Sequence, residues 1–157
     1  MHPKIKSLSA LLKLRQLWKK KNEKVVFTNG CFDVLHFGHV SYLRKAKSLG
    51  HRLVVGLNND ASVRKIKGEG RPINSEKDRA EILSELESVD AVVLFGEETP
   101  EHLIQAIRPD ILVKGADWKK EQIVGADFVE SYGGKVKRIQ FEPGRSTTGT
   151  LAKLKKI

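Results

Sequence analysis

The chain has 157 residues, enough for one domain with a sizeable core, and its hydrophobic share of 39% is ordinary for a globular protein. No apolar run approaches the roughly 18 residues of a membrane span, and the N-terminus lacks the pattern of a signal peptide. The single cysteine, Cys31, excludes an internal disulfide and a multi-cysteine zinc site, so we expect a cytoplasmic protein, and the net charge of +10 favours an anionic partner.

The first predicted element is an amphipathic helix over residues 8–18. Its apolar side chains fall on one helical face, namely Leu8, Leu11, Leu12 and Trp18. We interpret the lysine-rich stretch at 18–24 as a loop with a solvated surface. Residues 1–23 are therefore expected to form an N-terminal helix and basic loop packed on a domain that spans residues 24–157.

Short apolar runs and amphipathic runs alternate along the rest of the chain. Strands are expected at 24–27, 52–57, 91–95, 110–115 and 135–141, and helices at 39–50, 74–90, 99–107, 126–134 and within 145–157. Asn74 or Ser75 would cap the second of these helices, and Gly50 would stop the first. Thr99 would cap the third, with Pro100 at its first position. This alternation predicts a doubly wound α/β fold with a parallel sheet.

The unusual stretches of the sequence follow the strands. They read TNGCFDVLHFGH at 28–39, NND at 58–60, KGADW at 114–118 and EPGRSTT at 142–148. Because the carboxyl ends of parallel strands share one edge of the sheet, these stretches are expected to meet there. Ligands of open parallel sheets bind at that edge, near the switch in strand order.

Two histidines, His36 and His39, stand where the first strand gives way to a helix that starts near Gly38. A metal site is one interpretation, but no acidic or histidine ligand lies at a recognisable spacing. Capping or packing is a second. The third is a phosphate site, because a helix N-terminus offers free N–H groups, a glycine allows close approach, and imidazoles donate hydrogen bonds. We favour the phosphate site.

The stretch HFGH matches the H-x-G-H signature of the nucleotidyltransferase superfamily that includes the cytidylyltransferases. The chain resembles the bacterial D-glycero-β-D-manno-heptose 1-phosphate adenylyltransferases over nearly all of residues 24–150. The matching blocks are FTNGCFDVLHFGHVSYLRKAKSLG, LNNDASVRKIKGEGRPIN, RAEILSELESVD, LVKGADW and GRSTT. Some members are fused to a sugar kinase, and this chain resembles the stand-alone form.

The resemblance implies a Rossmann-like nucleotidyltransferase that transfers AMP from ATP to the sugar 1-phosphate. The products would be pyrophosphate and ADP-heptose for lipopolysaccharide core synthesis. Mg²⁺ is expected to be carried by ATP, without an assigned protein ligand. A homodimer is also a family expectation.

The resemblance also implies roles for individual residues. His36 and His39 would hold the triphosphate and stabilise the transition state. Lys67 would contact phosphate from a mobile glycine-flanked loop, with Lys65 as its rival. Arg79 would hold phosphate, a surface salt bridge being the structural alternative. Arg71 would face the sugar phosphate.

Nucleotide binding is implied for three turns. The residues are Thr28, Asn29, Gly30, Cys31, Phe32 and Gly38 in the first turn, Gly115, Asp117 and Trp118 in the second, and Ser146, Thr147 and Thr148 in the third. Helix capping alone would also explain the hydroxyl residues of the third turn. Cys31 is interpreted as a packing residue, since adenylyl transfer needs no covalent intermediate. Asp33 is expected to order its turn, and Asp60 to cap a helix or support the site.

Two rival functions are considered. One is a cytidylyltransferase for glycerol 3-phosphate or ethanolamine phosphate. The glycerol-phosphate enzymes carry an arginine where Phe141 stands here, while Arg145 lies inside the turn, which favours the heptose branch and leaves a phosphate contact by Arg145 open. The other rival is a basic nucleic-acid-binding protein. No zinc-finger or RNA-recognition signature supports it, so no nucleic-acid partner is expected.

Overall fold

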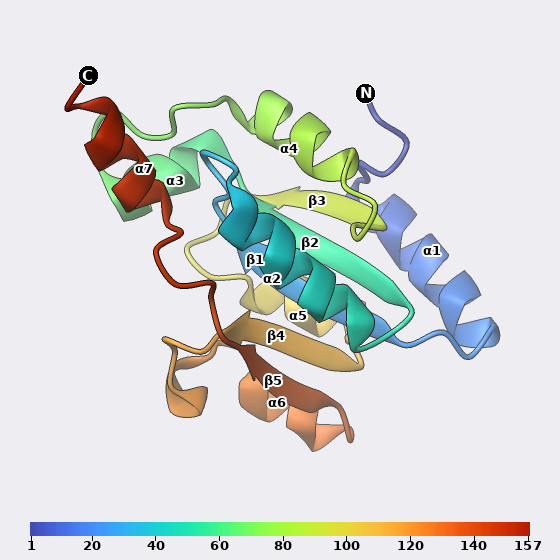
Figure 1. Cartoon of the computed structure of the whole chain (residues 1–157). Helices are drawn as coiled ribbons and strands as arrows, with labels where there is room; N and C mark the ends of the chain where they lie inside the picture. Colours follow the sequence, from blue (N-terminus) through green and yellow to red (C-terminus); the bar gives the residue numbers. More distant parts are fainter.

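A computed structural model describes residues 1–157 as a series in which strands alternate with helices, with two helices in succession between β2 and β3 (Figure 1). The strands are β1 (Val25–Gly30), β2 (Arg52–Asn58), β3 (Ala91–Phe95), β4 (Ile111–Gly115) and β5 (Lys135–Ile139). The helices are α1 (Leu8–Lys20), α2 (Phe37–Ser48), α3 (Asp60–Lys67), α4 (Glu76–Ser84), α5 (Glu101–Ile107), α6 (Ala126–Ser131) and α7 (Thr147–Leu154), with a 3₁₀ turn, η1, at Lys120–Gln122.

The five strands form one parallel sheet in the order β3-β2-β1-β4-β5. The order reverses between β1 and β4, which places the switch point beside the end of β1. The doubly wound α/β fold predicted from the alternation is confirmed.

Each face of the sheet has its own apolar core because side chains alternate along each strand. Val25 and Phe27 belong to a cluster of 15 buried residues shared with α1, α5 and α6. Val26 belongs to a second cluster of 15, shared with α2 and α4. The predicted helix at 8–18 is confirmed, and its Leu11 and Trp18 are buried in the first cluster.

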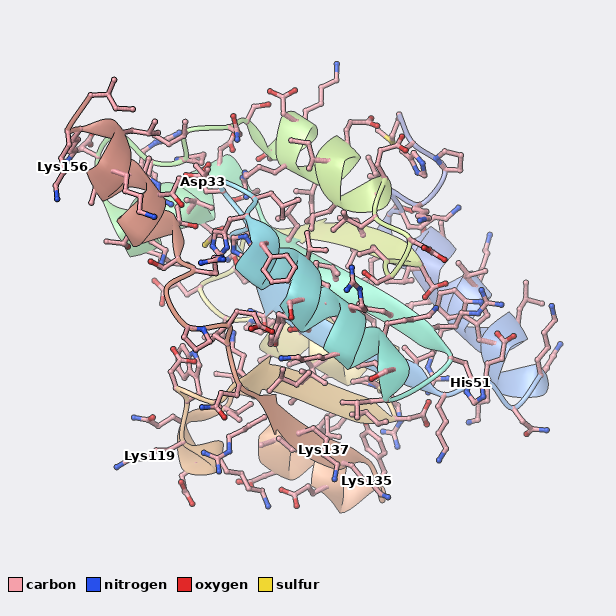
Figure 2. All side chains as sticks on the ribbon, in the orientation of Figure 1. Asp33, His51, Lys119, Lys135, Lys137 and Lys156 are labelled. Atoms are coloured by element: carbon pink, nitrogen blue, oxygen red, sulfur yellow. The ribbon has the colours of Figure 1, made fainter.

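One edge of the sheet is covered by another segment of the chain, and the other edge is open. The N-terminal segment covers β3, since Lys6 N donates to Val92 O (2.8 Å) and Val92 N donates to Lys4 O (2.9 Å). The β5 edge is open, and its exposed Lys135 and Lys137 oppose pairing with another strand (Figure 2). No helix of the structure has the length and apolar character needed to span a bilayer.

Several local expectations were wrong. The helix α3 was not among the predicted helices, because its residues are mostly polar and only Ser62 and Val63 are buried; its N-cap is Asn59, so Asp60 does not cap it. Thr99 does not cap α5, which begins at Glu101 without a side-chain cap. Gly50 does not adopt a left-handed stop. A Cβ there would lie 2.8 Å from the Val26 side chain, so close packing against β1 requires glycine. Ser75 does cap α4, which ends at Ser84 rather than near residue 90.

Candidate functional site

A cavity of about 490 Å³ opens where the strands end, as the convergence of the unusual stretches predicted. The predicted site residues that line it are Asn29, Gly30, Cys31, Phe32, His39, Lys67, Arg71, Trp118, Thr147 and Thr148. A second cavity of about 140 Å³ shares several of these residues and adds Gly115 and Tyr42. Six predicted residues line neither cavity: Thr28, His36, Gly38, Arg79, Asp117 and Ser146.

The two histidines stack at the start of α2, with their ring centroids 3.9 Å apart. His36 is the N-cap, and its Nδ1 accepts from Gly38 N at 3.1 Å. The Nδ1 of His39 accepts from His36 N at 3.3 Å. Because both Nδ1 atoms accept hydrogen bonds, each neutral ring carries its proton on Nε2, which remains available as a donor.

Both imidazoles are held in the neutral form. Burial lowers the pKa of His36, and burial together with the neighbouring His36 lowers the pKa of His39 to about 4. The His39 ring also contacts Phe32, at a centroid distance of 5.2 Å. Two neutral imidazoles anchored to the backbone can donate hydrogen bonds from Nε2–H to an anionic ligand. The charge of such a ligand would in turn stabilise the protonated form of the imidazoles.

Gly38 is explained by packing of side chains. A Cβ there would lie 2.8 Å from the His36 ring and 3.1 Å from Arg145 Cβ. The space beside Gly38 is therefore filled by protein, whereas the expectation was that a phosphate would approach there. Arg145, whose role the sequence left open, is brought against the start of α2 by this contact.

The third predicted turn divides its roles between its hydroxyl residues. Ser146 caps α7 by accepting from Gly149 N at 2.9 Å, and it stays outside the cavity. Thr147 and Thr148, in the first turn of α7, line the cavity. Helix capping and cavity lining thus fall to different residues of this turn.

Three cationic side chains line the cavity. Lys67 is the last residue of α3, where a mobile loop was expected, and Gly68 follows it with φ of +93°. Arg71 lies in the next segment and pairs with Asp33 (Nε–Oδ2 2.6 Å). Lys114 on β4 was not predicted, and its Nζ lies 3.4 Å from Asn29 Oδ1.

Lys114 is half-buried, and burial lowers the pKa of its ammonium group. Its Nζ also lies 5.1 Å from the centre of the Trp118 ring, and it lines both cavities. The sequence held one signal for this residue. A single lysine interrupts the apolar run ILVKG just before the glycine that ends the strand, where an apolar residue would otherwise be expected.

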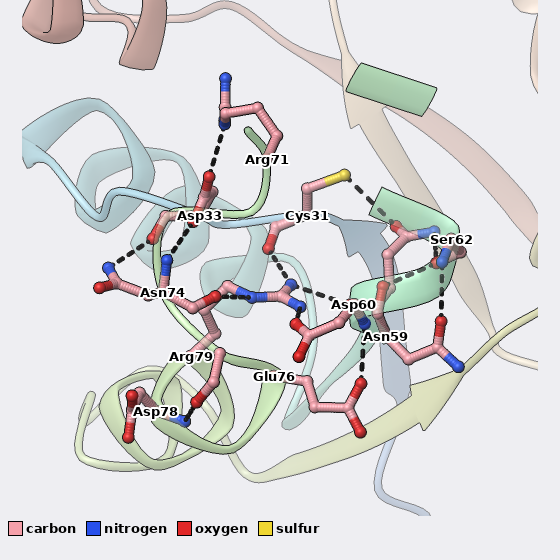
Figure 3. Close-up of polar contacts among 12 residues, drawn as sticks. Cys31, Asp33, Asn59, Asp60, Ser62, Arg71, Asn74, Glu76, Asp78 and Arg79 are labelled. Carbon is pink, nitrogen blue, oxygen red and sulfur yellow. Dashed lines mark hydrogen bonds and ion pairs between the residues drawn. The ribbon is translucent and has the colours of Figure 1, made fainter. Parts of the chain in front are cut away.

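Arg79 does not line the cavity; its side chain is 0% exposed and lies at the centre of a set of polar contacts (Figure 3). Its guanidinium donates to the carbonyls of Asn74 (3.0 Å), Cys31 (2.7 Å) and Asn58 (2.8 Å). It also pairs with Asp60 Oδ1 at 2.8 Å. Arg79 therefore ties the ends of β1 and β2 to α3 and α4. Its guanidinium is buried, so it is not exposed for the phosphate contact that the resemblance implied. It is not the surface salt bridge that was the alternative, either.

Asp33 orders a distant segment in addition to its own turn. Its carboxylate accepts from Ile73 N (2.8 Å), Asn74 N (2.9 Å) and Arg71 Nε. Burial alone would raise the pKa of Asp33, but these donors together lower it below its usual value. The anchored segment holds Arg71 beside the cavity.

The smaller cavity has aromatic walls. Phe141 stacks on Tyr42 at a centroid distance of 5.3 Å, and Trp118 is 43% exposed at the mouth. A Cβ on Gly115 would overlap the Phe141 ring and lie 2.6 Å from Asp117 Oδ1, so only glycine leaves this slot open. Thr28 is buried, with its hydroxyl 2.8 Å from that of Tyr42, and it supports the slot from inside β1.

Cys31 is the one thiol among these residues, and the acids and histidines are the possible metal ligands. Burial raises the pKa of the Cys31 thiol, which agrees with its interpretation as a packing residue. No three or more His, Cys, Asp or Glu side chains gather in a way that could hold a metal ion. The protein's own side chains therefore do not provide a metal cage.

Comparison with known proteins gives concordant matches. The Cytidylyltransferase-like family matches residues 27–143. The chain is 54% identical over 151 residues to the "Bifunctional protein HldE" of Wolinella succinogenes, covering 96% of this chain and 31% of that protein. It is 56% identical over 137 residues to the protein of the same name from Magnetococcus marinus, covering 87% and 28%. The chain thus spans about a third of the length of these relatives.

Two solved structures are also similar. A lipopolysaccharide core biosynthesis protein from Thermoplasma volcanium matches with a TM-score of 0.62 and 32% identity, over 76% of this chain and 97% of that one. A pantoate-beta-alanine ligase from Francisella tularensis matches with a TM-score of 0.62 over 92% of this chain and 68% of that one. At 18% identity the second match shows a common fold alone.

Proposed function

Because the chain belongs to the cytidylyltransferase-like family of nucleotidyltransferases, we propose that it transfers AMP from ATP to D-glycero-β-D-manno-heptose 1-phosphate. Pyrophosphate and ADP-heptose, a precursor for the lipopolysaccharide core, would be the products. The observation that carries the proposal is the stacked pair His36 and His39, anchored through Nδ1 at the start of α2 with His39 on the cavity wall. The sequence resemblance, quoted above block by block, supports the sugar substrate.

The reaction is an in-line displacement at the α-phosphorus. A phosphate oxygen of the acceptor forms the new P–O bond, the bond from the α-phosphorus to the bridging oxygen breaks, and pyrophosphate leaves with the electron pair. Such chemistry asks the protein chiefly for positioning and charge neutralisation. The Nε2–H groups of His36 and His39 would donate to phosphate oxygens, and these bonds strengthen as negative charge develops.

The hydroxyl residues and the cations that line the cavity would each bind phosphate groups of the two substrates. Thr147 and Thr148, in the first turn of α7, supply hydroxyl and N–H donors for the triphosphate. Lys67 and Arg71 extend the positive wall. Lys114 lines both cavities, so it stands where a nucleotide in one would meet an acceptor phosphate in the other.

The aromatic slot would receive the nucleobase. Trp118 and Phe141 offer stacking faces, and Gly115 leaves room between them. Where the glycerol-phosphate cytidylyltransferases have an arginine, Phe141 gives this slot an uncharged ring. The preference for ATP over CTP rests on the family resemblance, and a cytidylyltransferase is the second candidate function.

Further parts of the proposal rest on sequence pattern and resemblance. They are Mg²⁺ entering with ATP through phosphate oxygens, a homodimer, a cytoplasmic location, and the division into residues 1–23 and 24–157.

Pyrophosphate release tests the proposal directly. ATP and CTP would each be crossed with the heptose 1-phosphate and glycerol 3-phosphate, and turnover restricted to ATP with the heptose phosphate is expected. Turnover with CTP alone would overturn the substrate assignment and keep the reaction. His36→Ala and His39→Ala should each lose roughly 10²-fold or more in rate. Near-normal turnover in both variants would overturn the role of the histidine pair.

A further inference from the structure

We propose that the sugar ring of the acceptor binds in one part of the 490 Å³ cavity, the part lined by the β3–α5 connection and η1, which we call the sugar half-site. Glu98, Thr99 and Gln122 would hydrogen-bond the sugar hydroxyls and select a polyhydroxylated acceptor over a short alcohol phosphate. This inference rests on the proposed function and deepens it, because it names the residues that recognise the acceptor.

The elements that line the cavity contribute side chains of different charge. Lys67, Arg71 and Lys114 line it together with His39, whereas the β3–α5 connection and η1 contribute no cation. The charged residue that they do contribute is Glu98. Glu98 also borders a small cavity with Ile66 of α3, so Lys67 is the cation on the Glu98 side. Because a carboxylate repels phosphate, the phosphate of a sugar phosphate should lie toward Arg71, Lys114 and His39, and its ring toward Glu98.

Glu98 is free to accept hydrogen bonds. The adjacent Glu97 approaches His102 (3.7 Å) and accepts from Gly96 N (3.2 Å), whereas no hydrogen bond or ion pair engages the Glu98 carboxylate. The other acid on the cavity wall, Asp33, is fully occupied by Arg71 and two backbone donors. Glu98 is therefore the lining acid that a ligand hydroxyl can reach without displacing a protein partner.

Gln122 and Thr99 complement that acceptor. The Oε1 of Gln122 accepts from Lys119 N at 3.2 Å, which fixes the amide and leaves its two N–H donors available. Thr99 carries a hydroxyl that both donates and accepts, and it makes no hydrogen bond to the protein through that group. The β3–α5 connection and η1 thus supply both donors and acceptors to the cavity lining, as sugar hydroxyls require.

The floor of this half-site is apolar. Phe95, Leu112 and Ile123 are between 1% and 6% exposed and line the same cavity as the polar groups. An apolar floor with a few convergent polar groups is typical of sites for small ligands, and the C–H faces of a sugar ring fit such a floor. A three-carbon alcohol phosphate held by the cations would leave this surface to water.

The test separates acceptor binding from nucleotide binding. Glu98→Gln should raise the acceptor KM roughly tenfold, because about one hydrogen bond to a charged group is lost. The ATP KM should stay unchanged. Gln122→Ala should act in the same direction. Glu97→Gln and Gln105→Ala are matched controls, because both residues are exposed and lie outside the cavity. All variants should keep the wild-type melting temperature.

Four outcomes decide the inference. A raised acceptor KM in Glu98→Gln, with both controls at the wild-type value, supports it. An unchanged acceptor KM, or an equal rise in the ATP KM, overturns it while the proposed function stands. Failure of the wild-type protein to use any sugar 1-phosphate overturns the proposed function, and the sugar half-site with it. With glycerol 3-phosphate as a competitive inhibitor against the heptose phosphate, Glu98→Gln should leave the inhibition constant unchanged, and a tenfold rise there would contradict hydroxyl recognition of the ring.

Discussion

Replacement of Arg79 by alanine separates a structural role from a direct contact with phosphate. The side chain is 0% exposed, and its guanidinium satisfies three backbone carbonyls and the carboxylate of Asp60. Arg79→Ala would leave the carbonyls of Cys31 and Asn58 without this donor at the ends of the two central strands. We therefore expect a large loss of stability together with a disordered cavity wall.

The magnitude follows from the burial of these groups. A hydrogen bond that involves a charged group contributes about 1.5–3 kcal/mol, and four such bonds to one guanidinium do not add fully. Removal of one partner of a buried ion pair costs about 3–5 kcal/mol. Asp60 is 33% exposed and can regain water, so we expect a decrease of about 4 kcal/mol in the free energy of unfolding. For a domain of this size that corresponds to a melting temperature lower by about 10 °C.

Urea unfolding and ATP titration should be measured on the same samples, with Arg44→Ala as the control because Arg44 is an exposed arginine on α2. Arg79→Lys keeps the charge but has one nitrogen, which cannot span all four acceptors, so intermediate stability is expected. If Arg79→Ala keeps wild-type stability and loses ATP affinity, the structural role is refuted. If the alanine variant does not fold, the same comparison applies to Arg79→Lys.

Three further predictions concern the cavity. The pKa of His39 falls from 6.5 to about 4 on folding, so the unfolded chain binds the proton first and stability falls as the pH drops through this window. The loss should be about 2 kcal/mol near pH 5 in urea unfolding, and His39→Asn should remove it. Lys114→Met should lower kcat/KM by roughly 10²-fold with no loss of melting temperature, since a half-buried charge costs stability. Gly115→Ala should raise the ATP KM without affecting the acceptor KM, because its Cβ overlaps the ring of Phe141, and an unchanged ATP KM would argue against the aromatic slot.

The alternation of short apolar runs and amphipathic runs was sufficient to predict the sheet and its flanking helices. That pattern is local, because strand and helix periodicity, Ser75 as a cap and the glycines of the turns can all be read within a few residues. The meeting of the strand ends then follows from the parallel arrangement itself. The histidine pair and ten of the 23 residues that line the larger cavity were therefore predicted from the sequence. The helix α3 was not, because it is short, polar and exposed over most of its surface.

The tertiary structure decided which polar side chains line the cavity and which do not. The acceptors of Arg79 lie 5 to 48 residues away along the chain, so no local pattern reveals that its guanidinium is already satisfied. Asp33 likewise finds its donors about 40 residues away, and Lys114 meets Asn29 on the neighbouring strand, 85 residues apart in the sequence. The sequence by itself determined the fold class and the edge where the site forms, since both follow from periodicity. The roles of single charged residues depend on long-range partners and burial, which exist only once the chain has packed.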